Sequence, residues 1–228
     1  PALPTYPCDG TAYLVRGNTL SEIDIGSGAV ETIISDLGFD IDALAYHPLD
    51  KYLYGFQQGD NRVVRIDRNG VITQHSGPDA QPATMGTIDT DGYYWLGHGP
   101  DGFWAKIDVR PNWRPGDYTD FGWNQAFANL GYRILDWVDL SLGNDEYLYT
   151  VATGGPGDGT STLLRFSKIT KQWEVLNELY NTPSSGWGAM YGFEGSGPNF
   201  NTLFATDNAS GQIWKFQLSN GAAEFFSQ

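Results

Sequence analysis

One five-residue pattern recurs five times along the chain and constrains its fold more than any other feature. The second copy reads Val63-Val64-Arg65-Ile66-Asp67, with a charged residue between apolar neighbours, as expected for a half-buried strand. The charged position is occupied in turn by Glu22, Arg65, Lys106, Arg165 and Lys215. The intervals between these residues are 43, 41, 59 and 50. A period of about 40–50 residues with several short strands is typical of β-propeller blades.

Each repeat contains short alternating segments separated by Gly, Asn and Pro turns. We therefore predict an all-β chain that forms a five-bladed β-propeller of four-stranded antiparallel blades. A β-sandwich is the alternative fold, but it gives no reason for one register to recur five times. Almost no helix is expected, apart from one helical turn within residues 123–132. The expected blades of this single domain are residues 1–36, 37–76, 80–122, 130–180 and 184–228.

The first repeat lacks one expected strand. In the other four repeats an inner strand precedes the tyrosine-rich strand, at residues 41–46, 84–88, 134–140 and 187–193. The equivalent strand of the first blade either comes from the N-terminal residues 3–8 or is missing from this chain. The question matters because natural sheets avoid open edges, which pair readily with other chains.

Composition excludes several classes of function. The chain has 13 basic and 27 acidic residues and a net charge of −14, which argues against nucleic acid and anionic membrane surfaces as partners. No apolar stretch is long enough to insert into a membrane. Cys8 is the single cysteine and cannot form an internal disulfide or a zinc site alone. We expect a monomer with no cofactor and no metal centre, and leave a structural cation such as calcium open.

Two loops interrupt the repeat, at residues 110–133 and 153–161. The first contains Trp113 and Trp123, which lie outside the repeated strands. Tryptophan offers a large contact surface that suits the apolar faces of sugars, so both are candidate ligand-binding residues. Trp187 and Trp137 are near the starts of inner strands, where they either contact a ligand or pack between blades.

Three aspartates are candidate catalytic or ligand-binding residues. Asp42 and Asp136 occupy equivalent positions at the starts of inner strands, and Asp139 follows Asp136 further along its strand. Carboxylates that converge on a propeller channel could hold a cation or act as a general acid–base pair, as in glycoside hydrolysis. The alternative role is to cap backbone N–H groups.

His98, in the loop 97–101, is the histidine best placed for proton transfer or ligand binding, although a lone loop histidine can simply be solvated. The run Asp89-Thr90-Asp91-Gly92 resembles the beginning of a calcium loop. It lacks the later glycine and glutamate that an EF-hand requires, so we predict an ordinary turn there.

Several segments together resemble the DUF6923 family, a family of unknown function found in secreted fungal and bacterial proteins. The resemblance covers nearly the whole chain and depends on residues 8–14, 42–46, 52–55, 91–95, 136–137, 187–191 and 210–216. It implies a propeller carried on extracellular or cell-wall proteins, and no catalytic residue. The family pattern continues to a cysteine-containing segment, which would supply the missing inner strand and a partner for Cys8. In a secreted eukaryotic protein, Asn208-Ala209-Ser210 would be an N-glycosylation site.

These features lead to one preferred function and two alternatives. The preferred function is that of a secreted, acidic glycoprotein module that binds a polysaccharide or other glycan, such as a cell-wall carbohydrate. The first alternative is a carbohydrate-active enzyme, a glycoside hydrolase or lyase that uses the channel aspartates. The second is a passive cell-wall or adhesion domain. The lack of a recognisable catalytic motif favours binding over catalysis.

Overall fold

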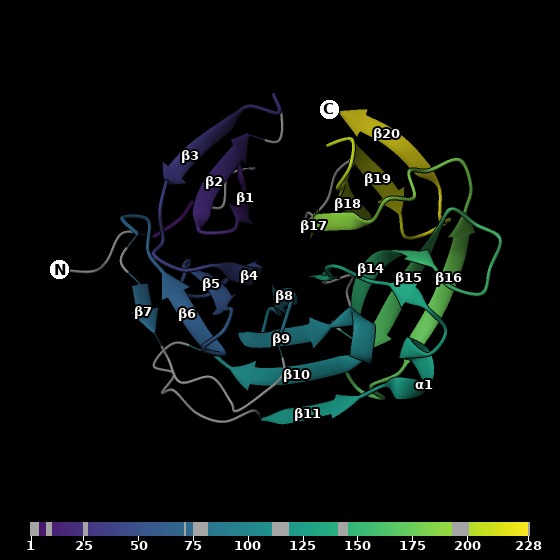
Figure 1. Cartoon of the computed structure of the whole chain (residues 1–228), viewed down its shortest axis with the longest axis horizontal. Helices are drawn as coiled ribbons and strands as arrows, with labels where there is room; N and C mark the ends of the chain where they lie inside the picture. The colour runs from purple at the N-terminus through teal and green to yellow at the C-terminus, as the bar shows by residue number, and fades with distance from the viewer. Residues whose placement is uncertain are drawn as a thin grey trace. The chain divides into compact units, whose positions relative to one another are not determined.

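The computed structural model of the chain confirms an all-β, five-bladed propeller of small antiparallel sheets (Figure 1). The structure describes residues 5–7, 11–24, 27–70, 72–74, 82–110, 119–140, 146–192 and 201–227. Within these residues the helices are α1 (Gln125–Ala128) and the single 3₁₀ turn η1 (Gly99–Asp101). The helix α1 lies inside the segment for which one helical turn was predicted.

The chain divides into two compact units. Unit 1 comprises Pro1–Gly97 and Trp104–Gly122, and unit 2 comprises His98–Phe103 and Trp123–Gln228. Each unit is described separately below. That all five blades form a single domain with the boundaries given above stays a prediction.

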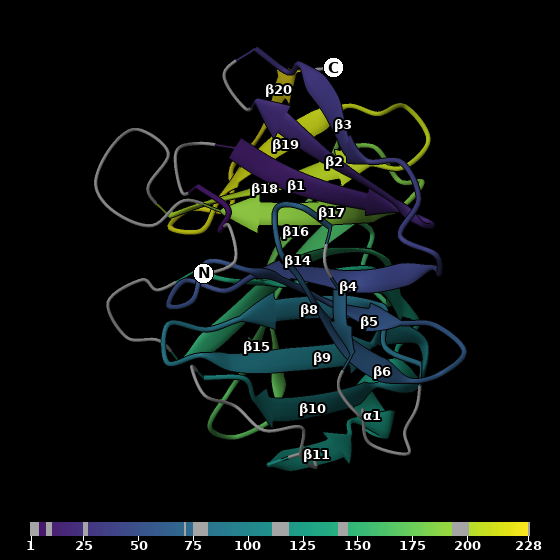
Figure 2. The same ribbon diagram turned by 90° about the vertical axis from the view of Figure 1, so that its left-hand side faces the viewer.

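Unit 1 contains most of three sheets. Among the described residues the first sheet has three strands, β1 (Thr11–Arg16), β2 (Thr19–Asp24) and β3 (Val30–Ile34). The second is β4 (Ile41–Tyr46), β5 (Leu53–Gln57), β6 (Arg62–Ile66) and β7 (Ile72–Gln74). The third is β8 (Met85–Ile88), β9 (Tyr93–His98), β10 (Phe103–Asp108) and β11 (Asp120–Trp123). Figure 2 shows β8, β9 and β10 side by side in this order.

Residues 5–7 do not form the inner strand that the first sheet lacks. They have no strand pairing, and Tyr6 is fully buried in the core of unit 1. The Tyr6 N–H donates to the Lys51 carbonyl at 2.8 Å, and its hydroxyl donates to the Asp67 carbonyl at 2.8 Å. The Tyr6 ring meets Tyr13 of β1 edge-on at 4.9 Å. Of the predicted strand 3–8, residues 3, 4 and 8 lie outside the described residues.

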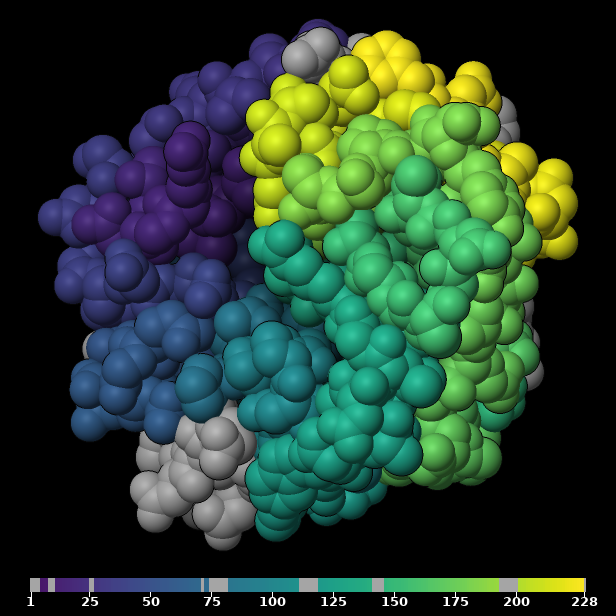
Figure 3. Space-filling model, turned by 45° about the vertical axis from the view of Figure 1, so that its right-hand side comes forward, coloured from purple at the N-terminus to yellow at the C-terminus, as the bar shows by residue number. Residues whose placement is uncertain are grey.

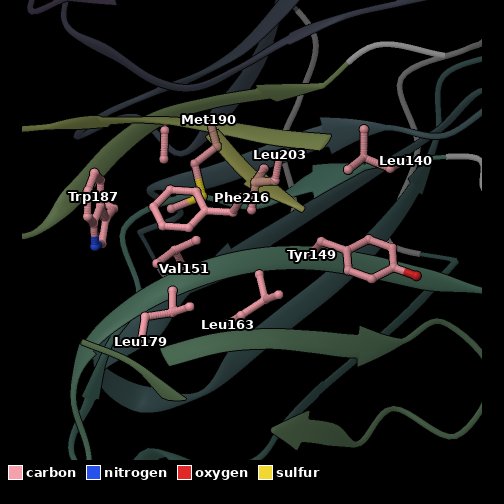
Figure 4. Packing of buried hydrophobic residues seen from close by; sticks show 10 residues of the cluster. Leu140, Tyr149, Val151, Leu163, Leu179, Trp187, Met190, Leu203 and Phe216 are labelled. Carbon is pink, nitrogen blue, oxygen red and sulfur yellow. The ribbon is translucent and has the colours of Figure 1, made fainter. Parts of the chain in front are cut away.

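Unit 2 contains α1 and the last two sheets. The fourth sheet is β12 (Tyr132–Arg133), β13 (Val138–Asp139), β14 (Tyr147–Gly154), β15 (Ser161–Ser167) and β16 (Trp173–Leu179). The fifth is β17 (Trp187–Gly192), β18 (Thr202–Asp207), β19 (Ile213–Gln217) and β20 (Ala223–Ser227). In place of one inner strand at 134–140, the structure has two short pieces, β12 just before this range and β13 within it, which pair with opposite ends of the long strand β14. Buried side chains of both sheets, including Leu163, Trp187 and Phe216, form one core (Figure 4).

The charged position of the repeat has a physical role in the sheets. In three of the five copies the side chain lies over the ring of a tyrosine at the start of the neighbouring strand or directly before it. This cation–π contact keeps the charge near solvent while the stem of the side chain packs on the sheet. The three observed pairs are Arg65 over Tyr52 at 4.8 Å, Lys106 over Tyr93 at 3.7 Å and Arg165 over Tyr147 at 3.9 Å. In these three blades the tyrosine and the charged residue of the repeat therefore form one contact, whereas Glu22 and Lys215 form ion pairs with Arg68 and Glu224.

A five-residue turn also recurs between strands. The carbonyl of its first residue accepts a hydrogen bond from the N–H of its fifth, which has a positive φ. The turns are Asp24–Gly28, His47–Lys51, Ser167–Lys171, Asp207–Gly211 and Gln217–Gly221. In the first four, the side chain of the first residue accepts a further backbone N–H inside the turn. Backbone N–H and carbonyl groups of each turn are therefore paired within the turn itself.

The turn prediction for Asp89–Gly92 is confirmed. The Gly92 N–H donates to the Asp89 carbonyl at 3.0 Å, and the Tyr93 N–H donates to Asp89 Oδ1 at 2.8 Å. The second carboxylate oxygen accepts a hydrogen bond from Trp95 Nε1 at 2.8 Å. Asp89 thus holds a turn and orients a buried tryptophan.

Candidate functional site

Asp136 uses its carboxylate to hold the backbone together. Its Oδ1 accepts a hydrogen bond from the Trp137 N–H, and its Oδ2 accepts one from the Met190 N–H, both at 2.9 Å. Met190 belongs to β17 and follows Ala189, which has a φ of +45° where the strand bulges. Asp136 therefore ties the inner strand of one blade to the bulge of the next, as the capping alternative expects.

Asp139 forms a buried ion pair. Its Oδ1 lies 3.2 Å from Lys168 Nζ, and both side chains are almost fully buried. A buried charge is costly unless it is paired, so each of the two charges offsets the cost of burying the other. This contact gives Asp139 a structural role within the fourth sheet.

Asp42 is half-buried in β4 of unit 1. Burial raises the pKa of its carboxyl group, and the nearby charge of Asp40 raises it further. The strand bulges directly after it at Ala43, whose φ is +57° and whose carbonyl accepts a hydrogen bond from the Tyr94 hydroxyl. A catalytic or ligand-binding pairing of Asp42 with Asp136 stays a prediction.

The tryptophans that belong to strand repeats are packing residues. Trp137 and Trp187 are almost completely buried. Trp187 donates from Nε1 to Ser161 Oγ at 2.8 Å and meets the Phe216 ring edge-on at 5.1 Å. Complete burial leaves Trp187 no face for a ligand in this conformation. Trp113 and Cys8 lie outside the described residues.

Trp123 is the predicted ligand-binding tryptophan that the structure places at the surface. Its side chain is 51 % exposed, and its ring rests against Phe103 at 5.6 Å. The Asn124 N–H donates to the Gly102 carbonyl at 2.9 Å, so the segment after Trp123 lies against the η1 turn. We call residues 98–103 and 123–130 of unit 2 the Trp123 corner. Figure 3 shows the teal part of the chain, which contains α1, at the surface.

The helix α1 holds this corner in place. Phe127 is stacked between Tyr132 and Trp173, with 5.0 Å between ring centres on each side. Asn124 caps the helix by accepting the Phe127 N–H, and its Nδ2 donates to the Lys171 carbonyl at 3.3 Å. A four-residue helix has no stability of its own in water. Its order therefore comes from these contacts with the fourth sheet.

His98 belongs to the same corner. Its Nδ1 lies 3.0 Å from Asp101 Oδ2, and both side chains are partly exposed. Asp101 is held in turn by the Phe103 N–H, which donates to its Oδ1 at 3.0 Å. A carboxylate beside an imidazole fixes the orientation of the ring. The structure thus places two of the predicted ligand-binding residues, His98 and Trp123, in one corner.

The second loop that interrupts the repeat, residues 153–161, packs on Tyr132 within unit 2. Gly155 has a φ of +92°, and a Cβ at this position would lie 2.5 Å from Cδ1 and 2.8 Å from Cζ of Tyr132. Only glycine can bring the backbone so close to the ring in this conformation. The glycines of this loop therefore have a packing role, and Tyr132 connects the loop to Phe127 of α1.

The sequence matches the family described as "Repeat of unknown function (DUF6923)" over residues 14–227. The chain belongs to the DUF6923 family. Among curated proteins, none matches this DUF6923 chain. The family resemblance inferred from the sequence is therefore confirmed, and secretion and biological source stay predictions.

Solved structures similar to the DUF6923 chain share its fold at low identity. A virginiamycin B lyase from Staphylococcus aureus has a TM-score of 0.55 at 14 % identity, covering 98 % of this chain and 68 % of that one. A chain of a nidogen/laminin complex has a TM-score of 0.62 at 11 % identity, covering 99 % and 79 %. An auxiliary nutrient binding protein from Bacteroides thetaiotaomicron has a TM-score of 0.57 at 13 % identity, covering 98 % and 56 %. Enzymes and binding proteins both use this fold, so the fold alone does not assign a function.

The remaining sequence predictions concern a metal centre, membrane insertion and glycosylation. Among the described residues, no cluster of three or more His, Cys, Asp or Glu side chains is arranged to hold a metal ion. In the described part of the DUF6923 chain, no helix is both long and apolar enough to cross a membrane. Asn208 is exposed in the turn between β18 and β19, and its glycosylation stays a prediction.

Sequence reasoning missed two polar residues of the Trp123 corner. Gln125 and Asn129 are exposed on α1, and Gln125 Nε2 donates to Asn129 Oδ1 at 3.1 Å. Their spacing of four residues was a usable signal, because such residues face each other across one turn of a helix.

Proposed function

We propose that this protein is a secreted, non-catalytic binding module whose Trp123 corner binds carbohydrate. The observation that carries the proposal is the half-exposed indole of Trp123, which is seated on Phe103 within a corner held by α1. A rigid aromatic face contributes a large contact area at low entropic cost and suits the apolar face of a sugar ring. Polar side chains beside it supply hydrogen bonds that orient a ligand.

The predicted carboxylates give less support to an enzyme. Asp136 accepts two backbone hydrogen bonds, and Asp139 is buried beside Lys168. A retaining or inverting glycosidase needs two carboxyl groups on either side of the scissile bond. Asp136 instead joins the fourth blade to the fifth, and Asp139 is paired with Lys168 within the fourth blade. The similar solved structures include a lyase and a nutrient binding protein, so the experiment below tests for both catalysis and binding.

The test is a glycan-binding screen combined with an assay for released reducing ends on the same polysaccharides. We expect binding without release, and at least a tenfold loss of affinity in Trp123→Ala. Tyr180→Ala is the matched control, because Tyr180 is an aromatic residue of unit 2 with a similar exposure of 59 %. Trp123→Phe, which keeps an aromatic ring over Phe103, separates a binding defect from a folding defect.

Three results would contradict the proposal. Release of reducing ends would favour the carbohydrate-active enzyme. Failure of the wild-type chain to bind any glycan would favour the passive cell-wall or adhesion domain. Equal losses of affinity in Trp123→Ala and Tyr180→Ala would show that the ligand binds elsewhere.

A further inference from the structure

The outward face of α1 carries two amide side chains in a defined arrangement. Phe127 occupies the inward face, stacked between Tyr132 and Trp173. Gln125 and Asn129 lie two residues before and after it, on the exposed side of the turn. Because the inward face is fixed by ring stacking and by the Asn124 cap, the outward face has a fixed orientation as well.

The amide pair offers a donor and an acceptor side by side. Gln125 Nε2 uses one of its hydrogens on Asn129 Oδ1, at 3.1 Å. The remaining groups are the Gln125 carbonyl oxygen, one Gln125 N–H and both Asn129 Nδ2 hydrogens. The mutual hydrogen bond restricts both side chains, so less conformational entropy is lost when a ligand binds. A hydroxyl group is both donor and acceptor, so two neighbouring hydroxyls can bond to this pair.

The chain segment that contains the Gln125–Asn129 pair has no charged residue. Residues 121–132 contain no Asp, Glu, Lys or Arg, although the protein has a net charge of −14. Arg133 follows this segment in the chain and donates to the Ser185 carbonyl at 2.9 Å. Lys171, whose carbonyl accepts a hydrogen bond from Asn124 Nδ2, donates from its Nζ to the Lys168 carbonyl. The Trp123 corner itself thus contributes amides and the carboxylate of Asp101 but no lysine or arginine, which disfavours an anionic ligand.

From these observations we infer that Gln125 and Asn129 recognise neighbouring hydroxyl groups of a neutral sugar that stacks on Trp123. The inference rests on the proposed function and narrows it to uncharged glycans. Uronic-acid and sulfated glycans are disfavoured, because the Trp123 corner offers amides and a carboxylate where such glycans require cations. Binding of the neutral glycan is correspondingly insensitive to salt.

The test measures affinity by calorimetry for neutral oligosaccharides of glucose, xylose and mannose, and for polygalacturonate, at low and high NaCl. The variants are Gln125→Ala, Asn129→Ala, the double variant and Trp123→Ala. Asn220→Ala is the control, because Asn220 is an exposed amide of unit 2 outside the Trp123 corner. Loss of one hydrogen bond should weaken neutral-glycan binding by about 3- to 10-fold. The double variant should lose less than the product of the single effects, because each amide positions the other.

The outcomes separate this inference from the proposed function. Loss in Trp123→Ala, Gln125→Ala and Asn129→Ala, with Asn220→Ala unchanged and salt without effect, supports both. Loss in Trp123→Ala alone overturns the role of the amide pair and leaves the proposed function intact. Tight, salt-sensitive binding of polygalacturonate overturns the neutral ligand class. Absence of binding to every glycan overturns the proposed function together with the inference.

Discussion

Replacement of Gly155 by alanine tests whether the glycine-rich loop is packed on Tyr132. Gly155 has a φ of +92°, and its missing Cβ would collide with the Tyr132 ring. Gly131 provides the control, since its φ is +80° and a Cβ there would meet no atom within 4 Å. Both glycines belong to unit 2.

The two substitutions differ by one physical effect. Each places an alanine in the left-handed region, which costs about 1–2 kcal/mol. Gly155→Ala also inserts a methyl group into occupied space, and overpacking of this kind costs about 1–3 kcal/mol more. We therefore expect Gly131→Ala to lose about 1–2 kcal/mol of unfolding free energy and Gly155→Ala to lose about 2–5 kcal/mol.

Urea unfolding followed by tryptophan fluorescence measures both losses. A second comparison uses Tyr132→Ala, in which the ring is absent. In that background, Gly155→Ala should cost no more than Gly131→Ala does in the wild type. Equal destabilisation by the two glycine substitutions in the wild-type background would refute the packing of Gly155 on Tyr132.

Three further changes test other contacts. Burial lowers the pKa of His47, whose Nε2 donates to the Val109 carbonyl at 3.0 Å. Below about pH 6.5 the unfolded chain therefore takes up a proton at His47 that the folded chain resists. The unfolding free energy should fall as the pH drops below that value, and it should fall less in His47→Gln. Identical urea midpoints at pH 7.5 and 5.5 would contradict this. Asp139→Asn leaves Lys168 buried without its charge partner and should cost about 3–5 kcal/mol of unfolding free energy, measured in guanidinium. Adding Lys168→Met should restore part of this loss. A loss below about 1 kcal/mol would show that the pair is dispensable. Phe127→Ala removes both ring stacks of α1 and should cost about 2–3 kcal/mol of unfolding free energy. Amide exchange should become faster throughout the helix. Unchanged exchange would contradict the anchoring role of Phe127.

The repeat made most of the fold predictable. Strand register is visible in sequence because apolar and charged residues alternate around positions such as Arg65 and Arg165, and five copies reinforce one another. The split inner strand of the fourth sheet was not predictable, since it depends on the length of β14 and on which end each piece joins. Irregular pairing of this kind is set by tertiary contacts rather than by local periodicity.

The site was only partly predictable. Trp123 was expected outside the repeated strands, but it is the last residue of β11 in the third sheet. It differs from Trp187 in exposure, because Trp187 lies in the inner strand β17 and is fully buried, whereas Trp123 is half exposed. The roles of Asp136 and Asp139 were hidden, since their partners Met190 and Lys168 lie 54 and 29 residues away along the chain. A carboxylate has the same sequence signature whether it binds a ligand or a backbone N–H.

The recurring five-residue turns make the blades modular. Each turn closes with hydrogen bonds between its own residues, as from Ser167 to Lys171, and needs no help from the loop at the other end of the strand. In the fourth blade, β15 begins after the glycine-rich loop and ends at such a turn. The chain can thus lengthen or vary one end of a hairpin while the other end preserves the strand register. This separation allows new binding loops to arise by insertion without redesign of the scaffold.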